Sequence, residues 1–419
     1  MCQSPTNAGL DSPDTASVSK GIDKKIEEER KAAESVIKLL LLGAGETGKS
    51  TILKQMKLIY TSGFTEQDRK SARAAIILGI CTSVKVLVNA MTELQIPYGF
   101  DASSPIPSDF EASHQQFLLS TSKIDEMNQS KASLRLQLQT AVAAYAAKCF
   151  QDSGGEHGQS GPAAQAALVV KNFDTILGFA NYEIITDEAK DAILALWADP
   201  GVQYCLKRSN EFQIMETCSF FLSDICRFCE EDYLPTNQDM LNSRVMTTQI
   251  TETIFSIDRI EYHVFDVAGQ RSQRKRWAPY FDNVHAIIFV AAISSYDQTC
   301  YEDNFTNRIT ESLNLFASIC NHPVFKSRPI ILFLNKIDIL KEKLPKVPVV
   351  NYFPDYQGDN DYETASSFFS QKFLAANKYT DKELYVHFTW ATDTNQVRKV
   401  LVNVNETITR QELASFGFV

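Results

Sequence analysis

The sequence predicts an α/β fold: a mostly parallel, six-stranded sheet with helices on both faces, into which an all-α domain is inserted. Apolar, strand-like segments alternate with helical ones before residue 63 and again after residue 248, which is typical of β/α units around a parallel sheet. Between residues 63 and about 232, helical periodicity dominates and strand-like runs are scarce. A glycine-rich turn joins the first predicted strand to the helix that follows it.

Composition limits the function classes. The chain has 419 residues, long enough for two or three domains with a large buried core. Its 44% hydrophobic and 22% charged residues are ordinary for a globular protein, which excludes wholesale disorder. The 41 Lys and Arg residues against 51 Asp and Glu residues give a formal charge of −10, which argues against a general nucleic-acid binder. No uncharged apolar run reaches the roughly 18–20 residues that span a bilayer.

The N-terminal part begins with a polar segment. Residues 1–15, rich in Ser, Pro, Thr and Asp, are expected to form a disordered tail. Residues 16–38 are predicted to be a helix, because apolar side chains recur on one face. This helix either packs on its own domain or presents a partner-binding stripe, and the sequence favours neither. Residues 36–42 suit a buried parallel strand, and residues 51–59 suit the helix after it.

The predicted boundaries divide the rest of the chain into three parts. Residues 16–62 hold the N-terminal helix and the first β/α unit, residues 63–236 the inserted helical domain, and residues 237–419 the remainder of the α/β domain. Within the insertion, about residues 100–185 are expected to be flexible, partly because glycines cluster at 154–161. Predicted helices of the insertion span 74–91, 134–150, 188–197 and 216–230; later strands span 250–257, 260–266, 286–292, 329–334 and 384–388, and a C-terminal helix spans 394–416.

Residues 43–51 read GAGETGKST, which fits the phosphate-loop pattern G-x-x-x-x-G-K-[ST] between a predicted strand and a predicted helix. Glycines let successive backbone N–H groups point into one concave nest around phosphate oxygens. Lys49 puts a positive charge against the outer phosphates, and Ser50 offers a hydroxyl to Mg²⁺. The motif therefore predicts a nucleoside triphosphate site, but it selects neither the base nor the reaction.

A second motif selects the base. Residues 335–338 read NKID at the C-terminal end of a predicted strand, where open α/β sheets bind ligands. The Asp338 carboxylate can accept hydrogen bonds from N1–H and the exocyclic amine of guanine. Adenine lacks that pair of donors, so it would leave a buried charge unpaired. The alternative, a strand-end Asn and Asp that merely cap a helix, is less favoured downstream of a phosphate loop.

Two further segments supply the chemistry of hydrolysis. In DVAGQ (266–270), Asp266 can hold Mg²⁺ through water, Gly269 can bring its N–H to a γ-phosphate, and Gln270 can orient an attacking water. In SRVMTT (243–248), Thr247 would complete the Mg²⁺ shell and Arg244 would neutralise charge on the transferred phosphoryl group. A surface ion pair is the alternative for Arg244.

The order of these motifs resembles that of heterotrimeric G-protein alpha subunits. The resemblance is carried by KLLLLGAGETGKST (38–51), SRVMTT (243–248), DVAGQRSQRK (266–275), FLNKID (333–338) and TWATDT (389–394). It implies a Ras-like P-loop GTPase domain and an inserted helical domain that closes over GTP. It also implies slow GTP hydrolysis with an arginine finger in cis, and a switch that relays signals from G-protein-coupled receptors to an effector that the sequence does not identify.

The resemblance also implies roles for individual residues. Arg244 and Gln270 are the catalytic pair, and Ser50 and Thr247 ligate Mg²⁺. Ser223 and Asp224 line the cleft from the helical domain. The full expected set of residues that bind GTP or GDP is Gly45, Glu46, Thr47, Gly48, Lys49, Ser50, Thr51, Ser223, Asp224, Leu241, Asn242, Ser243, Arg244, Thr247, Asp266, Val267, Ala268, Gly269, Gln270, Asn335, Lys336, Asp338 and Ala391.

Partners and location follow from the same resemblance. The N-terminal helix and the second switch would dock a beta-gamma dimer, and the C-terminal helix would be read by a receptor. The protein would lie in the cytoplasm and, peripherally, on the cytoplasmic face of the plasma membrane. Family members usually begin Met-Gly-Cys, whereas this chain has Cys2, so N-myristoylation is not expected and Cys2 is a candidate for palmitoylation.

Departures from the family pattern leave other hypotheses open. Ala268 replaces a glycine and is expected to stiffen the second switch, and Trp390 replaces a cysteine beside the guanine-reading Ala391 and is expected to alter nucleotide release. These departures and the long insertion allow a GTP-binding scaffold with negligible turnover. An ATP-dependent P-loop phosphotransferase is a third hypothesis, against which Asp338 argues.

Overall fold

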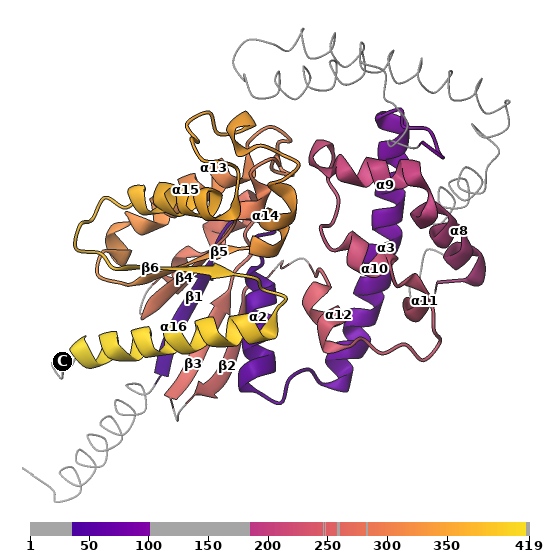
Figure 1. Ribbon diagram of the computed structural model, residues 1–419. Coiled ribbons are helices and arrows are strands. Elements are labelled where there is room, and N and C mark those ends of the chain that lie inside the picture. The colour runs from indigo at the N-terminus through magenta and orange to yellow at the C-terminus, as the bar shows by residue number, and fades with distance from the viewer. Residues whose placement is uncertain are drawn as a thin grey trace, which may run out of the picture.

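The computed structural model describes residues 36–100, 185–245, 247, 249–257, 260–281 and 284–415, with side chains as far as residue 410. A six-stranded sheet with the order β2-β3-β1-β4-β5-β6 forms one lobe (Figure 1). All neighbouring strands pair in parallel except β2 and β3, which form an antiparallel pair. The predicted fold class is therefore confirmed. The strands are β1 (Val36–Leu42), β2 (Thr251–Ile257), β3 (Ile260–Asp266), β4 (Ala286–Ala292), β5 (Ile330–Asn335) and β6 (Leu384–Thr389).

The inner strands β1, β4 and β5 are mostly apolar because both faces of the sheet are covered there. In β1, Leu40 and Leu42 belong to one hydrophobic cluster, whereas Leu39 and Leu41 belong to the cluster on the opposite face. Every residue of β4 and of β5 is buried. This burial fixes the register of the strands, since a slip of one residue would exchange the two faces.

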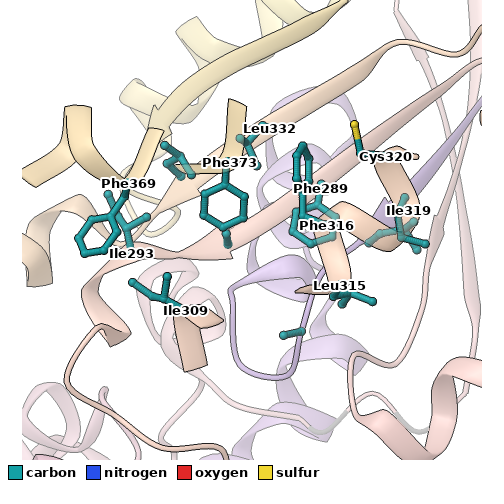
Figure 2. Packing of buried hydrophobic residues seen from close by; sticks show 14 of the residues in the cluster. Phe289, Ile293, Ile309, Leu315, Phe316, Ile319, Cys320, Leu332, Phe369 and Phe373 are labelled. Carbon is teal, nitrogen blue, oxygen red and sulfur yellow. The ribbon is translucent and has the colours of Figure 1, made fainter. Parts of the chain in front are cut away.

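Helices cover each face of the sheet. One face packs against α2 (Lys49–Tyr60) and α16 (Thr394–Ser415). The other packs against α13 (Arg308–Cys320) and α15 (Tyr362–Ala375), with α14 (Ile337–Lys343) at the end of β5. Figure 2 shows aromatic rings from α13, α15 and β4 filling this second interface. The strand ends that carry the predicted motifs are thus held by rigid packing.

The second lobe is built around α3 (Glu66–Glu93), a long helix that begins with a capping box between Thr65 and Asp68 (Figure 1). By length and composition α3 could cross a membrane, but its buried side chains form the core of this lobe. Shorter helices pack around it, and the chain returns to the sheet after the last of them. They are α8 (Asp187–Ala198), α9 (Pro200–Lys207), α10 (Cys218–Leu222), α11 (Ile225–Phe228) and α12 (Asn237–Asn242).

Some predicted elements differ from the structure. The single helix predicted at 216–230 is wrong: it is two short helices, because Asp224 leaves helical geometry (φ −128°, ψ 36°) and its carboxylate accepts a hydrogen bond from Arg227 instead. The helix predicted at 74–91 begins eight residues earlier, at the Thr65 cap. Residues 36–38, predicted to end the N-terminal helix, belong to β1.

Several predictions fall outside the described residues. These are the N-terminal tail, residues 16–35 of the N-terminal helix, the helix at 134–150, nearly all of the flexible insertion, and the end of the C-terminal helix at residue 416.

Candidate functional site

The phosphate loop lies between the C-terminal end of β1 and the start of α2. Gly43 and Gly48 have φ angles of 145° and 100°, a region that side chains rarely adopt. A Cβ atom on Gly43 would collide with the Val290 carbonyl, and one on Gly48 with the Asn335 amide. Gly45 lies opposite Gln270, whose Cγ would be 4.0 Å from a Cβ built on Gly45. The glycines therefore let the loop lie close against β4, β5 and the second switch.

Lys49 is buried at the bottom of this loop. Its ammonium donates hydrogen bonds to the carbonyls of Gly43 (3.1 Å) and Ala44 (2.7 Å). Burial lowers the pKa of Lys49 to about 8, although Asp266 opposes this shift. The charge is thus held in a poorly solvated position inside the loop, where an anionic group would offset the cost of its burial.

Ser50, Thr247 and Asp266 form a compact oxygen cluster beside Lys49. The Ser50 hydroxyl lies 2.8 Å from the Thr247 hydroxyl and donates to the Asp266 carboxylate at 2.7 Å. Asp266 is 2% exposed, and its Oδ1 has no hydrogen-bond partner among the described residues. Burial raises the pKa of Asp266. Two hydroxyls and an incompletely satisfied carboxylate are hard oxygen donors that suit Mg²⁺.

Glu46 joins the loop to two arginines. Its carboxylate pairs with Arg244 at 2.6 Å and with Arg308, at the start of α13, also at 2.6 Å. Burial acts to raise the pKa of Glu46, but the two guanidinium groups outweigh it and the pKa is lowered. Arg244 keeps 40% of its side chain exposed, so it is held by Glu46 but is not enclosed.

The second-switch segment begins with Asp266, and Val267 and Ala268 are buried against the sheet. A Cβ on Gly269 would collide with the Ala44 carbonyl and the Lys49 ammonium, so this backbone lies directly over the phosphate loop. The following turn is fixed by two contacts: the Trp277 indole donates to the Ala268 carbonyl (3.0 Å), and Arg274 donates to the Gly269 carbonyl (3.1 Å). Gln270 leads into a 3-10 turn at Arg271–Arg276.

Asn335 bonds three residues at the edge of the sheet. Its amide donates to the Thr47 carbonyl (2.8 Å), and its carbonyl oxygen accepts from the Thr389 hydroxyl (2.9 Å) and from the Ala391 N–H (3.2 Å). Gln55 of α2 donates to the Ala391 carbonyl at 2.8 Å. Asn335 and Ala391, which are expected to read the guanine base, thus also join the phosphate loop to the β6–α16 loop.

Asp338 and Lys336 flank the end of β5. Lys336 has a left-handed backbone (φ 64°) and forms an ion pair with Glu216 of the helical lobe. The Asp338 side chain is half-buried in the first turn of α14, and its Oδ1 has no hydrogen-bond partner in the described part of the chain. Burial, with a contribution from Glu216, raises the pKa of Asp338. An unpaired, half-buried carboxylate oxygen suits a ligand with N–H donors.

The helical lobe contributes fewer of the predicted residues. Ser223 and Asp224 occupy the turn between α10 and α11, where Asp224 pairs with Arg227 at 2.7 Å. Leu241, Asn242 and Ser243 are buried at the end of α12 and lead directly to Arg244. Trp390 is 41% exposed beside Ala391, and its backbone N–H donates to the side-chain oxygen of Gln396.

Sequence reasoning missed several residues of the site. Arg308 and Gln213 bond each other at 2.7 Å between the lobes, and Glu216 reaches Lys336. No spacing rule marks them, because their partners lie far away in the chain. Lys54 donates a hydrogen bond to Ser243, the residue before Arg244. Lys54 lies one helical turn after Ser50, and this spacing is the one feature of the sequence that could have indicated that it lies near the site.

Comparison with known proteins gives one consistent relationship. The family described as G-protein alpha subunit matches residues 16–408. The chain is 39% identical over 398 residues to the guanine nucleotide-binding protein alpha-1 subunit of Mycosarcoma maydis, and 39% identical over 398 residues to a guanine nucleotide-binding protein subunit alpha of Emericella nidulans. It is 38% identical to the alpha-1 subunit of Neurospora crassa, and in each case 95% of both chains is covered. The chain therefore belongs to the G-protein alpha subunit family, the GTP-binding and GTP-hydrolysing signal transducers that work with beta-gamma dimers and receptors at the inner face of the plasma membrane.

Proposed function

We propose that the cleft between the two lobes holds GTP or GDP with Mg²⁺, in the arrangement expected from the motifs. Residues 45–51 (Gly45, Glu46, Thr47, Gly48, Lys49, Ser50 and Thr51) bind the phosphates through backbone N–H groups and the Lys49 ammonium. The observation that carries the proposal is the Ser50–Thr247–Asp266 cluster beside the buried Lys49. A charge and three oxygen donors gathered in one poorly solvated place are costly unless a ligand compensates them.

Mg²⁺ fits this cluster. The Ser50 and Thr247 hydroxyls would ligate the ion directly, and Asp266 would hold it through water, using the carboxylate oxygen that lacks a partner among the described residues. Bound Mg²⁺ would neutralise charge on the outer phosphates. In the part of the chain that the structure describes, no group of three or more His, Cys, Asp or Glu side chains could hold a metal ion, so phosphate oxygens and water would complete its shell.

Hydrolysis depends on Arg244 and Gln270. Arg244 would turn from Glu46 toward the transferred phosphoryl group and stabilise the charge that develops there. Gln270, which precedes the 3-10 turn of the second switch, would orient the attacking water, and the Gly269 N–H would donate to the γ-phosphate. Val267 and Ala268 hold this backbone against the sheet.

The base lies at the end of β5. Asp338 would accept hydrogen bonds from the guanine N1–H and amine, and the aliphatic part of Lys336 would lie along the ring. Asn335 would support this loop, and the Ala391 N–H would exchange its bond to Asn335 for the guanine oxygen. From the helical lobe and hinge, Ser223, Asp224, Leu241, Asn242 and Ser243 would close the cleft.

The surfaces that bind protein partners are proposed from the same family relationship. The N-terminal helix and the Asp266–Trp277 segment would dock a beta-gamma dimer, and α16 would be read by a receptor. Cys2, outside the described residues, would carry a palmitoyl group for peripheral membrane association.

Single-turnover hydrolysis of GTP by Arg244→Cys and Gln270→Leu protein tests the catalytic assignment. We expect each rate constant to fall by about 10²-fold or more, because the arginine of a cis finger contributes on the order of 10³–10⁵. GTP binding should survive in both variants. Hydrolysis at the wild-type rate in both would overturn the assignment, and negligible turnover in the wild-type protein would favour the scaffold hypothesis.

A further inference from the structure

Lys54 makes a set of contacts that the proposed roles do not use. It lies on α2, and its ammonium donates to the carbonyls of Met240 (2.8 Å) and Ser243 (2.7 Å). A third bond, of 3.0 Å, reaches the Ser243 hydroxyl. All three acceptors belong to the end of α12 or to the residue that follows it, where the chain leaves the helical lobe. In Figure 1, α12 lies in the helical lobe on the side that faces α2.

These bonds complete the C-terminal end of α12. The last carbonyls of a helix have no partner within the helix and carry a partial negative charge, so a lysine there is favourable. Here the cation comes from another element rather than from α12 itself. Burial lowers the pKa of Lys54 to about 8, so the ammonium is still mostly charged at neutral pH. The contact therefore ties the phosphate-loop helix to the hinge.

The tied segment carries the groups expected to act on the nucleotide. Ser243 immediately precedes Arg244, and the Arg244 guanidinium pairs with Glu46 at 2.6 Å. Four residues after Ser243, Thr247 lies 2.8 Å from Ser50. Residues 240–247 are thus tethered at three points to the phosphate loop and its helix. The other two tethers join side chains, whereas two of the three Lys54 bonds are to main-chain carbonyls.

We propose that Lys54 is a positioning residue for Arg244: by gripping the main chain of residues 240–243, it sets the point from which the Arg244 guanidinium reaches the phosphates. The proposal rests on the role of Arg244 given above. Arg244 is partly exposed and long, so the placement of its backbone decides how much side-chain entropy is lost when it engages the transferred group. Lys54 itself does not touch the nucleotide.

The test compares Lys54→Met with Lys54→Arg and with the matched control Lys57→Met. Lys57 lies on the same helix but pairs with Asp68 of α3 at 2.8 Å. We expect Lys54→Met to slow single-turnover GTP hydrolysis about tenfold, because hydrogen bonds from a charged group are lost. Affinity for a non-hydrolysable GTP analogue should change less than about threefold. Lys54→Arg should restore most of the rate, since a guanidinium can donate to the same carbonyls, and Lys57→Met should match the wild type.

A double-mutant cycle with Arg244→Cys separates positioning from general destabilisation. Adding Lys54→Met to Arg244→Cys should slow hydrolysis no further, because the side chain that Lys54 positions is gone. An undiminished tenfold loss in that background would overturn the proposal, as would equal losses of hydrolysis and analogue binding. If Lys54→Met does not fold, Lys54→Gln, which keeps a neutral donor, is used in the same cycle with the same criteria. A wild-type rate in Arg244→Cys alone would instead refute the role proposed for Arg244.

Discussion

The two lobes contribute to the nucleotide cleft in different ways. In the sheet lobe, the site residues follow strand ends in short, contiguous motifs: the phosphate loop after β1, the second switch after β3 and NKID after β5. In the helical lobe, single residues reach the cleft from the loop between α9 and α10. In the sheet lobe, local backbone geometry places the residues of the proposed site. The residues from the helical lobe reach the site only because the two lobes pack against each other.

In the part of the chain that the structure describes, polar side chains form bonds across the cleft. Arg308 donates to Gln213 (2.7 Å), Gln213 donates to the Thr299 carbonyl (3.2 Å), and Lys336 pairs with Glu216. Each must break if the lobes are to separate. This contrast predicts that substitutions in the sheet lobe alter recognition and chemistry, whereas substitutions in the helical lobe alter the rate at which nucleotide leaves.

The largest expected effect comes from Asp338→Asn in the sheet lobe. Loss of the carboxylate removes two charge-assisted hydrogen bonds to guanine, so the affinity for GDP should fall on the order of 10²- to 10⁴-fold. The asparagine amide can instead donate to a carbonyl at the same ring position, so xanthosine diphosphate should bind better than GDP. Competition titrations measure both, with the exposed Asp359→Asn as the control. Unchanged preference for guanine would contradict the assignment of Asp338.

A smaller effect is expected from Glu216→Gln in the helical lobe. The Lys336–Glu216 pair is partly buried and bridges the cleft, so its loss should speed GDP release about fivefold, the range of a partly exposed ion pair. Single-turnover hydrolysis should stay at the wild-type rate. Fluorescent GDP release measures the first quantity, and Glu231→Gln, exposed in the same lobe, is the control. A change in the hydrolysis rate without a change in GDP release would contradict the proposal that the helical lobe controls release and the sheet lobe controls chemistry.

The same contrast explains what the sequence could predict. The inner strands β1 and β4 were predicted nearly to the residue because both of their faces are covered and their apolar runs are nearly continuous. The helix at 216–230 was predicted wrongly because Asp224 prefers a local bond to Arg227 over helix geometry. Glu216 and Arg308 were missed because their partners lie 120 and 262 residues away in the chain, and no local pattern encodes such pairs.

The structure also shows contacts of Asn335 that the NKID motif does not predict. Asn335 was assigned to the base, but its side chain bonds Thr47, Thr389 and Ala391 and so couples the two loops at the sheet edge. The motif fixes where Asn335 lies, because its strand ends there. It does not fix which atoms the amide will meet, since those come from elements 288 and 54 residues away.

The smallest expected effect lies in the sheet lobe but away from the cleft, at His263. Its ring contacts Glu252 (2.5 Å) and Glu261 (2.6 Å) on the antiparallel β2–β3 pair. Burial acts to lower the pKa of His263, but the hydrogen bonds and charges of the two glutamates outweigh it, so the pKa lies above its ordinary 6.5. The pairs therefore stabilise the folded state fully below about pH 6.5, and this contribution is lost as the pH rises through the higher folded-state pKa.

His263→Gln should accordingly lower the Tm of the GDP-loaded protein more at pH 6 than at pH 8.5, with a difference in stability below about 1 kcal/mol because the glutamates are exposed. GDP release should be unaffected at both pH values. His322→Gln is the matched control, because that histidine accepts a backbone N–H from Val324 rather than pairing with a carboxylate. Equal losses of Tm at the two pH values would show that the ion pairs of His263 do not stabilise the folded state. A change in GDP release would mean that charge at the β2 edge of the sheet affects the cleft. Residues of the sheet lobe would then control nucleotide release as well as recognition, and the proposed difference between the two lobes would be wrong.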